Sequence, residues 1–339
     1  MDLSTIQKID KSKMYEIYDN WPKIARESFE TNYEPIDFQN IEHIVFAGMG
    51  GSGAIGDIFA SILSKSKIHV NVVKGYALPK TVDSNSLVVV ISVSGDTNEA
   101  FSILESAHSI GSKIIVFSSG GKMKEYCQKN KINHRVIERF HSPRASYTSY
   151  LYGMLNVLHS ALQIKREDIT ESIEELEKLG DNINSKNLSN SNQALNLAKW
   201  INGIPLIYYP FGLQSAAIRF KNSLQENTKM HTFNEDIIEV CHNGIVAWEH
   251  TSSVQPIIIQ GADDHIKTKE RCSLLEEYFK KNSIQFYKIS SIKGSILSKL
   301  ITLIFLLDYV TIYLAVLQNI DPTPVKSIDF IKKRLKEIS

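Results

Sequence analysis

Two segments rich in glycine and hydroxyl residues carry groups that could bind an anion. Residues 48–53 read GMGGSG and residues 92–97 read SVSGDT. Each follows an apolar run and precedes helical spacing, so both are expected where a strand ends and a helix begins. Backbone N–H groups and hydroxyls at a helix start can hold a phosphate without a lysine. One such loop alone is more simply a tight turn or a helix capped by Ser94, but two at neighbouring strand ends favour a phosphate ligand.

The first of these loops also fits the GxGxxG pattern of dinucleotide-binding proteins, through Gly48, Gly50 and Gly53. An NAD site needs an acidic side chain near the end of the following strand, where it binds a ribose hydroxyl. Lys74 lies near that place instead. The pattern therefore disfavours NAD and leaves two alternatives, an NADP-dependent oxidoreductase and a structural turn without a ligand.

Three residues outside these loops could take part in acid–base or electrostatic catalysis: Arg144, Glu226 and His242. Arg144 follows Pro143 at the predicted start of a helix that runs to residue 163. A positive charge there opposes the helix dipole unless an anion or a carboxylate lies near it. Taken singly, such an arginine or glutamate is more often a surface charge, and a lone histidine is more often structural. The sequence has no HExxH, clustered Cys/His or GxSxG motif, so neither a metal site nor a serine hydrolase is expected.

Apolar runs alternate with helical spacing along the chain, which predicts an α/β fold of parallel sheets flanked by helices. A polar stretch at residues 166–190 predicts a connector between an N-terminal domain of residues 1–165 and a C-terminal domain of residues 191–339. Three strand–turn–helix units correspond in order between the two halves, which indicates a duplicated domain. Strands are predicted at residues 44–47, 70–73, 87–92, 113–117 and 135–138, and at 204–209, 256–260 and 285–289.

Charge and hydropathy limit the kinds of partner. The chain has 339 residues, with 38 Lys+Arg against 37 Asp+Glu, and a net charge of +1. A general nucleic-acid or anionic-membrane binder relies on a broad positive field, so neither partner is expected. Three cysteines without CxxC spacing, and an amino terminus without the apolar centre of a signal peptide, predict a cytoplasmic location. Residues 300–317 are long enough to span a membrane, but Asp308 at the midpoint would cost about 2.5–3.5 kcal/mol, so a buried helix is expected.

Five motifs together resemble those of one enzyme family. GMGGSG, SVSGDT, PRA, ENTK and HNGIVAW, in this order and spacing, resemble the archaeal-type bifunctional phosphoglucose/phosphomannose isomerases, which contain sugar isomerase (SIS) domains. GMGGSG and SxSGxT alone mark only a sugar-phosphate SIS domain, whereas PRA, ENxK and HN together are more specific. The resemblance implies two SIS-type domains, a homodimer, and no metal or redox cofactor. It also implies interconversion of glucose 6-phosphate or mannose 6-phosphate with fructose 6-phosphate through a cis-enediolate.

The resemblance further implies two sets of residues that bind the substrate. One set would hold the phosphate: Ser92, Ser94 and Thr97. The other set would lie against the sugar and its reacting carbons: Gly50, Gly51 and Ser52. The phosphate is remote from the reacting carbons, so its binding serves to orient the substrate.

The same resemblance implies catalytic roles. Glu226 would be the base that moves a proton between C2 and C1, and Arg144 would stabilise the negative charge of the enediolate. His242, reaching in from the neighbouring subunit, would open the sugar ring together with a lysine near the carboxyl terminus. Lys332 best matches the place of that lysine, and Lys333 is a competitor.

A non-catalytic sugar-phosphate-binding SIS regulatory protein is the alternative to an isomerase, because it would share the phosphate loops but need no base. The presence of Arg144, Glu226 and His242 together favours the isomerase. Acceptance of both C2 epimers requires room at the site, for which Thr311 and Thr323 are candidates.

Overall fold

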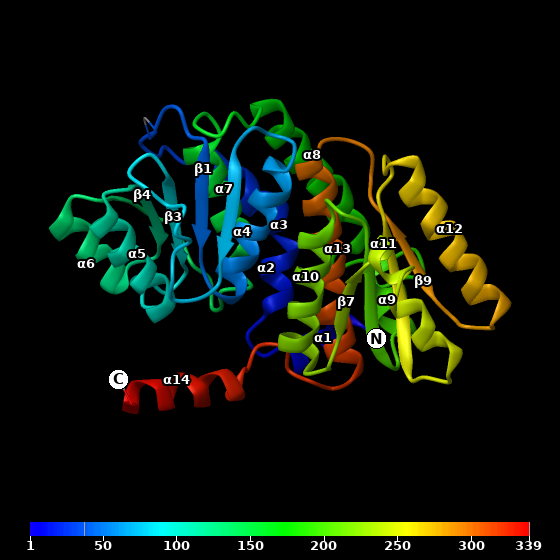
Figure 1. Ribbon diagram of the computed structural model, residues 1–339. Helices are drawn as coiled ribbons and strands as arrows, with labels where there is room; N and C mark the ends of the chain where they lie inside the picture. Colours follow the sequence, from blue (N-terminus) through cyan, green and yellow to red (C-terminus); the bar gives the residue numbers. More distant parts are fainter. Residues whose placement is uncertain (37, 339) are drawn as a thin grey trace.

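The computed structural model describes residues 1–36 and 38–338, and its strands form two parallel sheets. The first sheet has the order β2-β1-β3-β4-β5 and the second has the order β7-β6-β8-β9. Figure 1 shows the sheets on opposite sides of the molecule, with α10 and α13 between them. The predicted α/β fold with two parallel, helix-flanked sheets is confirmed. The strands are β1 (His43–Ala47), β2 (His69–Val73), β3 (Leu87–Ser92), β4 (Lys113–Ser118), β5 (Asn133–Val136), β6 (Ile204–Tyr209), β7 (Phe233–Asp236), β8 (Val254–Gln260) and β9 (Tyr287–Ser290).

The two sheets share a topology. The order β2-β1-β3-β4 of the first corresponds to the order β7-β6-β8-β9 of the second, and neighbouring strands run parallel in both. This correspondence supports the duplication that the sequence indicated. Strand β7 was not predicted, because it is four residues long, reads FNED and leaves Phe233 exposed, so it lacks an apolar run. Strand β5 begins two residues earlier than predicted and also ends two residues earlier.

Helices flank both sheets and fill the space between them. The helix predicted at residues 55–63 begins five residues earlier, so the second half of the GMGGSG loop is its first turn. The helix predicted to start at Pro143 begins only at Tyr147, since residues 143–146 form turns. The helices are α1 (Leu3–Ile9), α2 (Met14–Asp19), α3 (Trp21–Glu30), α4 (Gly50–Leu63), α5 (Asn98–Ile110), α6 (Gly121–Asn130), α7 (Tyr147–Leu158), α8 (Arg166–Ile183), α9 (Gln193–Trp200), α10 (Gln214–Ser223), α11 (Ile237–Val240), α12 (Ile266–Lys281), α13 (Ile296–Leu317) and α14 (Lys326–Ile338), with a π-helical turn at Leu224–Thr228 and a 3₁₀ helix at Gly244–Glu249.

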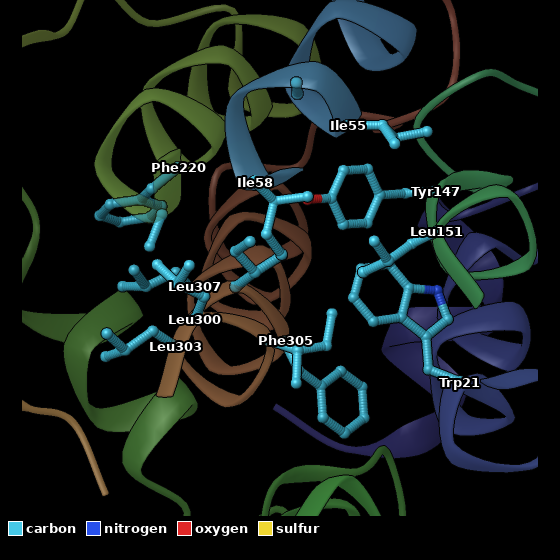
Figure 2. Close-up of a cluster of buried hydrophobic side chains, with 14 of the residues drawn as sticks. Trp21, Ile55, Ile58, Tyr147, Leu151, Phe220, Leu300, Leu303, Phe305 and Leu307 are labelled. Carbon is cyan, nitrogen blue, oxygen red and sulfur yellow. The ribbon is translucent and has the colours of Figure 1, made fainter. Parts of the chain in front are cut away.

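Helix α13 is the centre of the hydrophobic core. It has no glycine or proline over its 22 residues, and the side chain of Ser295 caps its amino end. It is long and apolar enough to cross a membrane by length and composition, yet 94% of its most apolar window is buried inside the fold. Figure 2 shows side chains of α13 packed against α4, α7, α10 and α3. The predicted buried helix is confirmed.

Helix α8 occupies most of the segment that was predicted as a polar connector. Its apolar residues Ile169, Ile173 and Leu176 recur at helical spacing and are buried, while its charged residues face outward. The helix packs against α13 and α3. The polar composition therefore reflects one solvated face of a packed helix, and the division into domains at residues 165 and 191 stays a prediction.

Candidate active site

The glycine loop of residues 48–53 forms the amino end of helix α4. Gly50 has a φ of +53°, a left-handed conformation that favours glycine. No side chain caps this helix in the described part of the chain, and Ser52 is buried in its first turn. A Cβ atom on Gly51 would lie 3.3 Å from the backbone of Pro143. The loop therefore packs directly against the segment that carries Arg144.

The hydroxyl loop of residues 92–97 is shaped by its own hydrogen bonds. The hydroxyls of Ser92 and Thr97 lie 2.9 Å apart, and the Gly95 amide donates to the Ser92 hydroxyl. Ser94 does not cap helix α5, as the simpler interpretation expected; its hydroxyl accepts a hydrogen bond from the amide of Asp96. Gly95 has a φ of +76°, and a Cβ there would lie 1.8 Å from the carbonyl oxygen of Gly120. The loop is thus packed closely against the loop that follows β4.

The two loops lie at the same edge of the first sheet. Strands β1 and β3 are neighbours in the sheet and run in the same direction. A Cβ on Gly48, directly after β1, would lie 3.0 Å from the carbonyl oxygen of Ile91 in β3. The expected position of both loops at neighbouring strand ends is therefore confirmed.

Arg144 lies in a turn before α7 and is 3% exposed. Its guanidinium donates from Nε to Asn227 Oδ1 at 2.7 Å and from Nη1 to Glu226 Oε2 at 2.8 Å. Its Nη2 donates to the carbonyl oxygens of Pro322 at 2.8 Å and Thr323 at 2.7 Å. The sequence placed Arg144 at a helix start, where its charge would oppose the dipole. The structure places it three residues before the helix. Glu226 supplies the nearby carboxylate that a positive charge at this place was expected to need.

Glu226 lies in the π-helical turn that continues helix α10. Such turns add one residue to a helix and occur frequently at functional sites. The side chain of Glu226 is 26% exposed, so its carboxylate both contacts Arg144 and reaches the surface of a pocket. Glu226 thus lies at the end of a helical segment, and the π-helical form of that end is not visible from periodicity alone.

Two further residues of the ENTK motif belong to this arrangement, although sequence reasoning gave them no role. Asn227 is fully buried and accepts the bond from Arg144. Lys229 has a φ of +61° and donates from Nζ to the carbonyl oxygens of Glu226 and Pro322. Burial, and to a lesser extent the charge of Arg144, lower the pKa of Lys229. Their place in a four-residue motif around Glu226 was the signal that could have identified them.

A pocket of about 850 Å³ lies between the glycine loop, the π-helical turn and the beginning of α14. It is lined by Gly50 of the glycine loop, by Glu226 and Lys229, and by residues 324–328 at the beginning of α14. A second pocket, of about 620 Å³, lies between α2, α3 and the segment after β5 and contains none of the predicted site residues. The residues described by the structure include no group of three His, Cys, Asp or Glu side chains that could hold a metal ion.

Of the site residues predicted from the sequence, Gly50 and Glu226 line this pocket. Arg144 contacts Glu226 but is not among the lining residues. The remaining predicted residues do not line it either: Gly51, Ser52, Ser92, Ser94, Thr97, His242, Lys332 and the alternative Lys333. His242 follows α11 and is exposed, and its backbone amide bonds to Glu239. Lys332 and the alternative Lys333 lie on α14 and are also exposed. Figure 1 shows α14, in red, extending away from the rest of the chain.

Lys74, on which the NADP alternative rested, is held by a carboxylate. Its ammonium lies 2.6 Å from Asp57 of helix α4. Burial raises the pKa of Asp57, and the neighbouring Lys74 opposes that rise. Lys74 therefore neutralises a partly buried carboxylate in this structure, which disfavours a 2′-phosphate partner.

Sequence models of known domains match most of the chain. The sequence model of the SIS domain matches residues 37–162, and that of the bacterial phospho-glucose isomerase C-terminal SIS domain matches residues 190–335. The chain is 32% identical to a bifunctional phosphoglucose/phosphomannose isomerase of Caldicellulosiruptor bescii, over 96% of this chain and 99% of that protein. It is 30% identical to the protein of the same name from Aquifex aeolicus, over 89% and 92%.

A solved structure shares the fold. A hypothetical protein from Thermus thermophilus superposes with a TM-score of 0.77 at 12% identity, covering 98% of this chain and 93% of that one. This similarity shows a shared fold, and the SIS assignment of both halves comes from the two domain models. The sequence identity of 30–32% over most of the chain shows that it belongs to the family of bifunctional phosphoglucose/phosphomannose isomerases.

Proposed function

We propose that this protein is an aldose–ketose isomerase that interconverts glucose 6-phosphate and mannose 6-phosphate with fructose 6-phosphate. The observation that carries the proposal is the contact between Arg144 and Glu226, 2.8 Å apart beside the glycine loop. Isomerisation through a cis-enediolate needs one carboxylate to remove and return a proton and one fixed cation to stabilise the oxyanion. These two groups contact each other, and Glu226 also lines the pocket beside the glycine loop, although the two residues lie 82 positions apart in the sequence.

The proton transfer is assigned to Glu226. Its carboxylate would take the proton from C2 of the aldose and deliver it to C1, which gives the ketose. As negative charge develops on the enediolate oxygens, the guanidinium of Arg144 would shift part of its pairing from Glu226 to them. Arginine stays charged at any working pH, so this stabilisation does not depend on a titration.

Substrate orientation is assigned to the two loops at the edge of the first sheet. Ser92, Ser94 and Thr97 would hold the phosphate with hydroxyl and backbone N–H groups. Gly50, Gly51 and Ser52 would lie against C1 and C2, since Gly50 and Glu226 line the same pocket. The start of α4 supports this assignment, because none of the described side chains caps its first turn, although the amide of Ser52 donates to the carbonyl oxygen of Met49.

Ring opening is assigned to His242 and Lys332, in a homodimer where His242 serves the neighbouring subunit's site. The exposure of both residues supports a partner. So does α14, on which Ile328, Ile331 and Leu335 form an exposed apolar stripe. The three free thiols support the expected cytoplasmic location.

Subunit complementation tests the dimer. Chains with Glu226→Gln and chains with His242→Ala should each be inactive, while an equal mixture after joint refolding should regain about a quarter of wild-type activity. Half of the dimers would then be hybrids, each with one intact site. A mixture that stays inactive, although hybrid dimers are detected by native mass spectrometry, would refute the shared site.

The function itself is tested by a coupled assay with each hexose 6-phosphate at neutral pH, with and without added metal. Turnover of both is expected. Glu226→Gln should abolish turnover while a sugar-phosphate analogue still binds, as measured by calorimetry. If folded wild-type protein binds the analogue but turns over neither substrate, the regulatory alternative is correct. Calorimetry with NADP, where no binding is expected, tests the oxidoreductase alternative.

A further inference from the structure

We infer that Thr311, on the buried helix α13, is a positioning residue that orients Arg144 through Asn227. The inference rests on the proposed function, since it concerns the geometry of the Arg144–Glu226 pair. Thr311, Asn227 and the nearby Asp308 are all 0% exposed, so none of them can touch the substrate. Together with Arg219 they form a chain of hydrogen bonds that begins and ends on Arg144. We call this chain the buried bracket; it runs from Arg144 through Asn227, Thr311, Asp308 and Arg219 back to Arg144.

The first part of the buried bracket fixes the orientation of the Asn227 amide. The hydroxyl of Thr311 donates its single proton to the carbonyl oxygen of Asp308 at 2.7 Å. The Thr311 oxygen can therefore only accept from Asn227, and the Nδ2 group of Asn227 donates to it at 2.7 Å. This leaves Oδ1 of Asn227 facing the other way, toward Nε of Arg144.

The direction of these hydrogen bonds determines which atom of Asn227 faces the guanidinium of Arg144. Arginine has donors only, so it needs an oxygen at the position of Asn227 Oδ1. With the Thr311 hydroxyl removed, the amide could rotate and present its NH₂ group to Arg144, which would repel it. The plane of the guanidinium, and with it the direction of Nη1 toward Glu226, depends on this bond.

The second part of the buried bracket fixes the backbone of Arg144. The carboxylate of Asp308 accepts from Arg219 at 2.7 and 3.0 Å and from the Ser223 hydroxyl at 2.6 Å. The same guanidinium of Arg219 donates to the carbonyl oxygen of Arg144 at 2.9 Å. Hydrogen bonds therefore connect both the main chain and the Nε atom of Arg144 to one turn of α13.

The buried bracket joins groups from three distant parts of the chain. The turn before α7 supplies Arg144, α10 and its π-helical turn supply Arg219, Ser223 and Asn227, and α13 supplies Asp308 and Thr311. The described hydrogen bonds of the phosphate loop do not include any of these residues. Loss of the bracket should therefore lower the rate of the chemical step and leave binding of the phosphate almost unchanged.

Two matched pairs of variants test this inference. Thr311→Val keeps the shape of the side chain without the hydroxyl, and Thr311→Ala against Thr311→Ser differs by the hydroxyl oxygen alone. The hydroxyl-free variants should lower kcat about 10- to 100-fold, because the guanidinium of Arg144 loses the hydrogen bond to Asn227 that orients it. The KM for fructose 6-phosphate should stay within about twofold, and Thr311→Ser should restore most of kcat.

A double-mutant cycle separates positioning from general stability. If Thr311 acts through Asn227, adding Thr311→Val to Asn227→Ala should lower kcat little further, whereas independent effects would multiply. Unfolding in urea checks that each variant is folded at the assay temperature; should Thr311→Val not fold, the Ala and Ser pair carries the same comparison. Wild-type kcat in Thr311→Val or Thr311→Ala, or multiplicative effects in the cycle, would overturn the inference. Absence of turnover in the wild type itself would instead refute the proposed function.

Discussion

Replacing Arg144 by lysine separates the charge of this residue from its geometry. Lysine keeps a positive charge next to Glu226. Its single ammonium cannot occupy all three positions that Nε, Nη1 and Nη2 of the arginine take. These nitrogens donate four hydrogen bonds, to the side chains of Asn227 and Glu226 and to two main-chain carbonyls after α13.

The size of the effect follows from the number of bonds lost. An ammonium placed toward Glu226 would lose the bond to Asn227 and at least one of the bonds to the carbonyls of Pro322 and Thr323. Two charge-assisted hydrogen bonds correspond to about 3–6 kcal/mol of gross interaction. At about 1.36 kcal/mol per factor of ten, the expected fall in kcat/KM for Arg144→Lys is about 10²–10⁴-fold.

The assay measures fructose 6-phosphate turnover coupled to the formation of glucose 6-phosphate. Arg139→Lys is the matched control, because Arg139 lies in the same connection between β5 and α7 but is exposed. That control should keep wild-type kcat/KM. If Arg144→Lys stays within about tenfold of the wild type, charge alone is sufficient, and the reasoning from the fixed guanidinium is refuted.

Three further results are expected. Gly95→Ala should raise KM about tenfold or more, because the added Cβ meets the carbonyl of Gly120 at 1.8 Å; an unchanged KM would exclude this loop from phosphate binding. Cys241 should be the thiol that reacts quickly with a disulfide reagent, since it is partly exposed while the other two are buried. Burial raises the pKa of all three thiols, so the order of reaction is expected to follow exposure; Cys241→Ser should remove the fast phase, and two fast thiols would contradict the structure. Burial lowers the pKa of His134, so the unfolded chain binds a proton at this histidine at higher pH than the folded chain does. The free energy of unfolding should therefore decrease from about pH 7 to 5, and it should decrease less steeply in His134→Gln. Equal slopes of the wild type and the variant in urea titrations would refute the assignment.

The sheets could be predicted from sequence because continuous apolar runs define buried parallel strands. The run at residues 87–92 coincides with β3 and the run at residues 204–209 coincides with β6. Strand β7 escaped prediction because an edge strand of four residues needs no apolar run. The helix expected from Pro143 starts only at Tyr147, and in the turn before it the backbone amide and the hydroxyl of Ser146 both donate to the carbonyl oxygen of Ser142.

The site could be predicted only in part. The positions of the two loops could be predicted from the ends of the strands, since the carboxyl ends of parallel strands meet at one edge of the sheet. The contact of Arg144 with Glu226 could not be derived from spacing, because it depends on how the two halves pack. The role of Asn227 was hidden for a similar reason: its orientation is set by Thr311, 84 positions later in the chain. The roles of His242 and Lys332 stay predictions from the family resemblance.

The position of α13 in the chain has a consequence for folding. This helix packs against α8, α9 and α10 and also contacts α1, α2 and α4 from the amino-terminal part. The hydrogen bond between Tyr18 and Asp308 joins residues that are 290 positions apart in the chain. During synthesis α13 emerges after every strand that the structure describes, so the amino-terminal half waits with apolar surface exposed until the last helices are made. The two sheets are therefore expected to gain their stability together, in one slow and late cooperative step, and a chain that stops before α13 should aggregate instead of forming an independent first domain.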